Sequence, residues 1–216
     1  MMKIRLYHFL IVGFAATTFL LVMMSKNIAV EGAGTLKVSV DPADSDIVVF
    51  KWDGVIDPPM AKRFSEEFEI WKGDAKLFVI DLNSPGGRLN EGENVIRFIR
   101  KMKKTHSVET YVGPDGSCLS MCVPVYLQAD MRVASKTSQW MFHEAGFSDT
   151  VTGQTVNVYA YEKRQASVEF FNRYLKRSEI DRDWLDYLQR EWRGREVWKT
   201  GKELKDERAN IVMVVE

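Results

Sequence analysis

The chain has 216 residues, a length that suits one domain with a large core. Hydrophobic residues make up 45% of it and charged residues 28%, which are the values of a folded globular protein and not of a disordered one. Lys and Arg together number 30, and so do Asp and Glu, so the charge balance gives no reason to expect a nucleic-acid partner. Globular enzymes and binding domains remain.

The first thirty residues have the layout of a secretory signal. Lys3 and Arg5 precede an uncharged apolar run at residues 9–24, and a more polar segment follows. This run of 16 residues is long for a signal peptide and just short of a comfortable membrane span, so both a cleaved signal and a retained anchor fit. We therefore expect residues 1–33 to be a signal peptide or N-terminal membrane anchor, and residues 34–216 to be one exported domain.

Short runs of β-branched and aromatic residues predict the strands of this domain. They lie at residues 47–52, 77–80 and 108–112, with shorter candidates at 131–134 and 139–142. The second run lacks polar residues altogether, which is typical of a strand that is buried on both faces in a parallel sheet covered by helices.

Helical periodicity separates the strands. One helix is predicted after Pro59, a second after Gly87, and a third at about residues 120–129. The chain is again helical from 159 to 193 and ends in a small strand at 211–215. Alternating strands and helices predict an α/β domain with right-handed crossovers.

The first candidate site feature is the segment 83–87, with the sequence Asn-Ser-Pro-Gly-Gly, at the carboxyl end of a predicted strand. α/β proteins bind ligands at such strand ends. Two glycines free the backbone to adopt positive φ and to approach a ligand closely, and an N–H group there can donate to a developing oxyanion. A plain strand-to-helix turn is the alternative.

The second feature is Ser120, which lies at the predicted start of a helix. A serine at this place is commonly an N-cap, yet the same place offers free N–H groups to an oxyanion. Pro124 keeps Ser120 at the helix end, because proline is tolerated only near a helix start. Ser117 is the local competitor for the role of nucleophile.

The third feature is His143, which ends an apolar strand where a base would be held rigidly. His8 lies in the signal segment and His106 follows a basic stretch, so neither is a candidate. His143-Glu144 does not begin a zinc-binding His-Glu-x-x-His motif, because Phe147 stands where the second histidine must fall. No cofactor motif is present, and we expect no metal and no cofactor.

Together these features resemble the proteolytic subunit of Clp protease. Asn-Ser-Pro-Gly-Gly is followed by Ser120-Met121, with Ser120 33 residues after Gly87, and then by Met-Phe-His143, 23 residues after Ser120. The likeness is greatest to exported, periplasmic Clp-like proteins of bacteria, and it covers about residues 47–215. It implies a Clp/crotonase-like α/β fold over residues 34–216, a spiral of repeated ββα units with a C-terminal helical segment.

The resemblance also implies a serine endopeptidase that hydrolyses peptide bonds through an acyl-enzyme. Ser120 is the implied nucleophile, His143 its general base and Glu196 the group that orients the imidazole. The N–H groups of Gly87 and Met121 are the implied oxyanion hole. The family has Asp where this chain has Glu196, which is one methylene longer.

The implied substrate is a peptide or unfolded protein, bound as an extended strand along Gly86, Arg88 and Leu89. Relatives of this fold form rings or trimers, so the resemblance implies a homo-oligomer. The implied location is the periplasm, either free or attached to the inner membrane through residues 9–24. The polar segment 147–155 is predicted to be a loop near the site.

Cys118 and Cys122 flank Ser120 and are the only cysteines in the sequence. Export permits a disulfide, and a spacing of four on a helix brings the two Cα atoms within bridging range. A disulfide and a pair of buried thiols are both open interpretations.

Two other functions compete with the peptidase. One is a catalytically silent Clp-like module that binds peptides or scaffolds an envelope complex, which a weak triad would favour. The other is crotonase-type acyl-CoA chemistry on the same fold, against which export argues because CoA is cytoplasmic.

Overall fold

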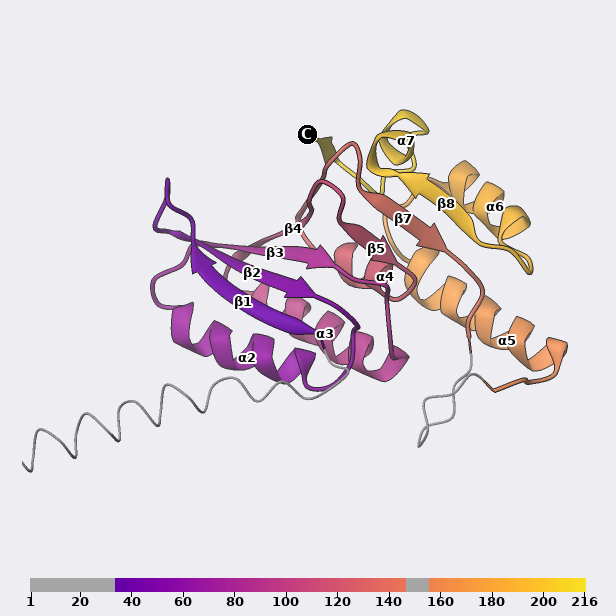
Figure 1. Ribbon diagram of the computed structural model, residues 1–216, viewed down its shortest axis with the longest axis horizontal. Helices are drawn as coiled ribbons and strands as arrows, with labels where there is room; N and C mark the ends of the chain where they lie inside the picture. The colour runs from indigo at the N-terminus through magenta and orange to yellow at the C-terminus, as the bar shows by residue number, and fades with distance from the viewer. Residues whose placement is uncertain (1–33, 147–155) are drawn as a thin grey trace, which may run out of the picture. The chain divides into compact units, whose positions relative to one another are not determined.

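The computed structural model describes residues 34–146 and 156–216 (Figure 1). The signal peptide or anchor expected at residues 1–33, and the loop expected at 147–155, lie outside these described residues. Throughout the described ranges, each helix is too short or too polar to span a bilayer.

The main sheet has six strands in the order β1-β2-β3-β4-β6-β9 within the described part of the chain. Its members are β1 (Thr35–Val40), β2 (Ile47–Asp53), β3 (Leu77–Asn83), β4 (Ser107–Val112), β6 (Met131–Ala134) and β9 (Val214–Val215). β1 pairs antiparallel with β2, and every other pair is parallel. Parallel neighbours must be joined by crossovers, and helices supply the first two of these.

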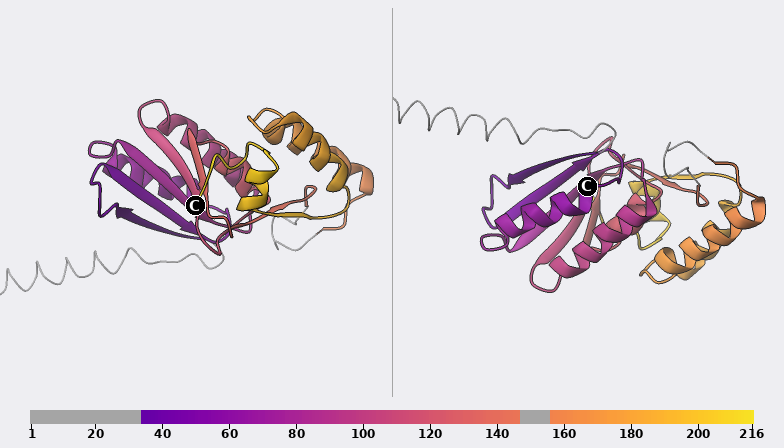
Figure 2. Two further views of the ribbon diagram at one scale, coloured as in Figure 1. Left: turned by 90° about the horizontal axis from the view of Figure 1, so that it is seen from above. Right: turned by 90° about the horizontal axis from the view of Figure 1, so that it is seen from below.

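Helices α2 (Met60–Trp71) and α3 (Leu89–Met102) cover one face of this sheet (Figures 1 and 2). Their buried positions recur at helical spacing, and they meet an aromatic cluster on the strands. The ring of Phe50 lies 5.6 Å from that of Phe64 and 5.3 Å from that of Phe78, both edge-on. Phe68 joins the cluster, 5.1 Å from Phe78. This packing fixes the carboxyl end of β3, where the candidate site begins.

A second, three-stranded sheet consists of β5 (Ser117–Leu119), β7 (Gln139–Phe142) and β8 (Val197–Thr200). β5 and β7 are parallel, whereas β7 and β8 are antiparallel. The segment after β3 joins the two sheets: the Ser84 N–H donates to the Ser117 carbonyl at 2.7 Å, and the Leu119 N–H donates to the Ser84 carbonyl at 3.0 Å. The end of β3 is thereby held beside β5.

Four more helices and one π-helical turn complete the described chain. They are α4 (Cys122–Tyr126), α5 (Ala160–Phe170), the π-helix η2 (Phe171–Leu175), α6 (Arg182–Glu191) and α7 (Gly201–Asp206). Asp181 caps α6 by accepting from the Trp184 N–H at 3.0 Å, and Thr200 and Glu203 form a capping box on α7.

The α/β class and most of the predicted elements are confirmed. The strands predicted at 131–134 and 139–142 have the observed bounds. The helix predicted at 120–129 is wrong in its extent, because residues 120–121 form a turn and the helix covers only 122–126. The helical stretch predicted at 159–193 is broken at residues 176–181, and the last strand covers two residues.

A buried arginine fastens the C-terminal segment to the main sheet. The Arg132 side chain, only 3% exposed, donates to the carbonyl groups of Ile211 at 3.0 Å and Asn210 at 3.1 Å. It also pairs with Glu179 at 3.3 Å. These contacts satisfy the buried guanidinium and bring β9 alongside β6.

We predict that Arg132→Met lowers the free energy of unfolding by about 2–3 kcal/mol, because the carbonyl groups of Ile211 and Asn210 lose their donor. Denaturant unfolding followed by circular dichroism measures the change. The control Arg190→Met removes an exposed arginine of α6 and should stay within about 0.5 kcal/mol. Equal stability of the two variants would contradict the fastening role.

Candidate active site

Ser120 lies in a sharp turn between β5 and α4. Its φ of +53° is in the left-handed region, which costs a non-glycine residue about 1–2 kcal/mol. The turn is held by the Ser120 N–H, which donates to the Met141 carbonyl at 2.9 Å, and by the Val123 N–H, which donates to the Ser120 carbonyl at 3.1 Å. Such strained turns from strand to helix expose a serine hydroxyl at the end of a sheet.

His143 directly follows β7, the parallel neighbour of β5. The register pairs Leu119 with Met141, so both strands end on the same side of the sheet. There the Ser120 Oγ and the His143 Nε2 lie 2.7 Å apart in a hydrogen bond. The competing hydroxyl of Ser117 donates instead to the Asn83 side chain at 3.1 Å. The structure therefore brings together the predicted serine and histidine and leaves Ser117 elsewhere.

The surroundings of His143 favour the neutral imidazole. Burial lowers the pKa of His143 below its ordinary value of 6.5; the charge of Glu196 raises it, and that of Lys163 lowers it further. The net effect is a lowered pKa, so at neutral pH the Nε2 atom is free to accept a proton from the serine hydroxyl.

Glu196 lies beside the histidine but does not hold it. The antiparallel register of β7 and β8 ends with Phe142 opposite Val197, and the next residues in that register are His143 and Glu196. Yet the Glu196 carboxylate is exposed and accepts from the Trp198 indole N–H at 2.9 Å. Within the described residues, the His143 Nδ1 atom has no hydrogen-bond partner. The charge of Glu196 therefore affects the pKa of His143, but the carboxylate forms its hydrogen bond with Trp198 and not with the imidazole.

The backbone N–H groups of Gly87 and Met121 donate to none of the described residues. Both residues line the same pocket as Ser120. At Gly86 and Gly87 the backbone lies so close to neighbouring segments that no side chain fits. A Cβ atom on Gly86 would lie 2.8 Å from the Ser120 Cβ, and one on Gly87 would lie 2.2 Å from the Ile56 carbonyl oxygen. Unpaired N–H groups beside a serine hydroxyl are the arrangement of an oxyanion hole.

A pocket of about 500 Å³ opens beside Ser120. Arg88 and Leu89, the residues predicted to bind substrate, line one side of it, while α5 and η2 line the other side. Gly86, the third residue predicted to bind substrate, does not line this pocket. Its carbonyl group accepts a hydrogen bond from the Ile56 N–H at 2.8 Å. Leu89 is the first residue of α3, so of Arg88 and Leu89 only Arg88 has an extended backbone.

Two further contacts, which the sequence did not indicate, fasten the segment after His143. The Ala145 N–H donates to the buried hydroxyl of Ser167 on α5 at 2.9 Å. The Glu144 carboxylate accepts from the Gly194 N–H at 3.1 Å. Both partners are distant in sequence, and no local pattern singles them out.

Cys118 and Cys122 form a disulfide, with their Cα atoms 5.1 Å apart. Both side chains are fully buried. Cys118 belongs to β5 and Cys122 begins α4, so the bridge joins the two ends of the turn that contains Ser120 and Met121. The covalent link thus spans the candidate nucleophile and one of the candidate oxyanion donors.

Compared by sequence, the chain matches no protein-family model and none of the curated proteins. Compared by structure, it is similar to solved proteases. A mutant of the membrane-bound stomatin-specific protease 1510-N has a TM-score of 0.61 at 16% identity, over 79% of this chain and 78% of the other. A second mutant, in complex with a substrate peptide, has a TM-score of 0.59 at 14% identity, over 79% and 74%.

A mutant of ClpP1 from Listeria monocytogenes has a TM-score of 0.57 at 17% identity, over 78% of this chain and 90% of the other. At these identities the likeness is one of fold. It agrees with the order of motifs in the sequence. The chain therefore has the Clp protease-like fold.

Proposed function

We propose that this protein is a serine endopeptidase in which Ser120 is the nucleophile and His143 the general base. The observation that carries the proposal is the 2.7 Å hydrogen bond between the Ser120 hydroxyl and the His143 Nε2 atom. A serine hydroxyl is inert near neutral pH unless such a base takes its proton. The fold shared with proteases supports the same assignment.

The proposed reaction follows from this geometry. The Ser120 Oγ attacks the peptide carbonyl carbon while its proton passes to the His143 Nε2 atom. The negative charge that develops on the carbonyl oxygen is stabilised by the N–H groups of Gly87 and Met121. His143 then protonates the leaving amine, which yields the acyl-enzyme. Water, deprotonated by the same imidazole, hydrolyses the ester and regenerates the serine.

In this proposal Glu196 stabilises the imidazolium form of His143 by its charge. An orienting hydrogen bond to Nδ1 requires the carboxylate to leave the Trp198 indole, a change that substrate or assembly would have to induce. The present hydrogen bond favours a second candidate function, a silent module that binds peptides without turnover.

We further propose that the substrate is a peptide or unfolded protein and that the domain is exported. The structurally similar protease 1510-N is membrane-bound, and one of its structures contains a substrate peptide, which supports both ideas. A buried disulfide suits an oxidising compartment. The apolar run at residues 9–24 is then a signal peptide or an anchor to the inner membrane, with the domain in the periplasm.

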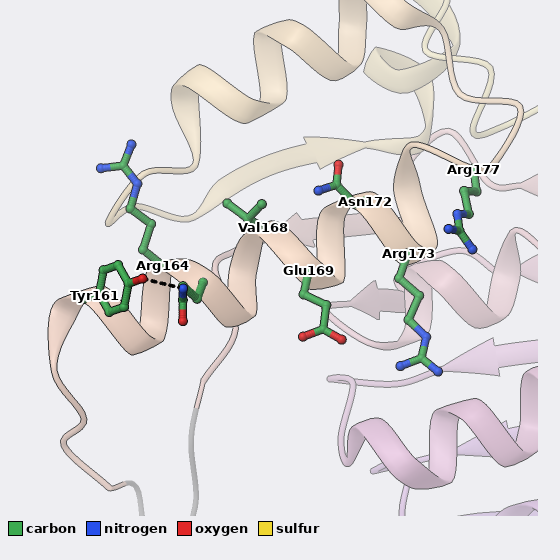
Figure 3. A pocket seen from close by; sticks show the side chains of 8 residues that line it. Tyr161, Arg164, Val168, Glu169, Asn172, Arg173 and Arg177 are labelled. Carbon is green, nitrogen blue, oxygen red and sulfur yellow. Dashed lines mark hydrogen bonds between the residues drawn. The ribbon is translucent and has the colours of Figure 1, made fainter.

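A homo-oligomer completes the proposal, and helix α5 is the surface that supports it. Ser167 is the only buried residue of this 11-residue helix. Tyr161 is 69% exposed and, with Val168, lines an open groove of about 850 Å³ along α5 and η2 (Figure 3). Helices of this length are marginal without tertiary packing, so a second copy of the chain would stabilise α5.

We predict that a fluorophosphonate probe labels the full-length protein at Ser120. Ser120→Ala should abolish labelling, and His143→Ala should slow it by at least about a hundredfold because the hydroxyl loses its base. Ser117→Ala is the matched control and should label normally. In-gel fluorescence and peptide mass mapping give the rates and the site. A folded wild type that is never labelled would instead support the binding module.

The labelling rate should rise with pH as His143 loses its proton, with a midpoint below pH 6.5 because the pKa of His143 is lowered. Lys163→Met removes a nearby cation and should move the midpoint upward, whereas Glu196→Gln removes a nearby anion and should move it downward. His106→Gln is the control and should leave the midpoint unchanged. A wild-type midpoint above pH 6.5 would contradict this account of the site.

Light scattering after size-exclusion chromatography should give a mass of at least two chains, each of 24.9 kDa in the full-length protein. Tyr161→Ser should lower that mass if α5 forms the contact. Ile70→Ser removes a similarly exposed apolar side chain of α2, 59% exposed, and should leave the mass unchanged. A wild-type monomer would rule out the assembly.

A further inference from the structure

The pocket beside Ser120 is lined by three charged side chains, those of Arg88, Glu169 and Arg173. They come from opposite walls of the pocket. Arg88 precedes α3, whereas Glu169 belongs to α5 and Arg173 to η2. What the pocket binds depends on which of these charges already have partners within the protein.

Both arginines are engaged by carboxylates. The Arg88 Nε atom lies 2.8 Å from an Asp57 carboxylate oxygen. The Arg173 Nη1 atom lies 2.9 Å from a Glu93 oxygen, and the Tyr174 hydroxyl donates to that same oxygen. Arg173 and Tyr174 are consecutive residues of the π-helical turn, and both reach one carboxylate on α3. Each cation in the pocket is therefore matched by an anion.

Glu169 has no such match. It forms no salt bridge and no side-chain hydrogen bond with any residue in the ranges 34–146 and 156–216. Figure 3 shows Glu169 and Arg173 projecting to the same side of the helical segment, opposite Asn172. Yet Arg173 pairs with Glu93. Of the charged side chains that line the pocket, Glu169 is the one without an ion-pair partner within the described residues.

The rest of the pocket suits a long aliphatic side chain. Leu89 and Met121 line one wall, and Ala166 and Phe170 line the other. Apolar walls with a single charged group pack the methylene stem of a lysine or arginine while its charged head meets the acid. The volume of about 500 Å³ leaves room for such a side chain together with backbone.

We infer that Glu169 is a specificity-determining residue, and that the pocket selects peptides with a basic side chain next to the bond held at Ser120. Glu93 supports this selection by keeping Arg173 from neutralising Glu169. The inference rests on the proposed function for the identity of the ligand, a peptide, but it does not require that the peptide be cleaved.

Binding is measured with the full-length Ser120→Ala protein, so that no peptide is consumed. Three fluorescent peptides share an Ala/Ser background and differ at one central residue, which is Lys, norleucine or Glu. Fluorescence anisotropy should show the Lys peptide binding about fivefold more tightly than the norleucine peptide, as expected for one partly exposed ion pair. The Glu peptide should bind most weakly of the three.

Variants in the same background test the two carboxylates. Glu169→Gln should equalise binding of the Lys and norleucine peptides. Glu93→Gln should do the same, because it releases Arg173 to pair with Glu169. Glu162→Gln is the matched control, seven residues earlier on α5 and outside the pocket, and it should preserve the preference for Lys. Because Glu169 is exposed, its substitution leaves the fold intact.

Equal binding of the Lys and norleucine peptides before substitution would overturn the inference, and so would a preference for Lys that survives Glu169→Gln. The proposed function fails differently. If wild-type protein is not labelled by fluorophosphonate but the preference for Lys holds, the chemistry is rejected and the charge selection stands. If the wild-type protein is labelled but shows no preference for Lys, the charge selection is rejected and the chemistry stands.

Discussion

The site depends on how closely the backbone at Gly86 approaches the turn that carries Ser120. Ser84 pairs with both ends of β5, which places Gly86 against the candidate nucleophile. A single methyl group on Gly86 would collide with the Leu119 carbonyl oxygen at 2.7 Å. The consequence is that segments from two sheets bring together two N–H groups that have no acceptor among the described residues.

Elements that depend on local pattern were predictable. Continuous apolar runs predicted β2, β3 and β7, and helical spacing of large apolar residues predicted α2, because burial of those side chains decides these elements. The motif order also predicted that Ser120 and His143 meet. That prediction drew on a family resemblance, since nothing in the local sequence states that β5 and β7 are neighbours in one sheet.

Features set by long-range pairing were not predictable. β5 was not predicted, because its three residues are extended only through their pairing with β7. The register of β7 and β8, continued by one residue, sets Glu196 opposite His143, but the Glu196 carboxylate accepts its hydrogen bond from Trp198. The wall formed by α5 and η2 is held by Ser167, Arg173 and Tyr174, whose partners are distant in the chain. The sequence therefore does not indicate which charged residues of this wall form ion pairs.

The disulfide around Ser120 also bears on how the protein matures. With only two cysteines in the sequence, oxidation within one chain can give a single bridge, so a disulfide isomerase has no wrong pairing to correct. The loop it closes is short, and chain-entropy arguments assign such a loop only about 2 kcal/mol. Its main effect is thus local: it fixes the nucleophile turn while adding little to global stability. A dithiol oxidase acting once on each molecule is sufficient to complete the covalent structure of the site.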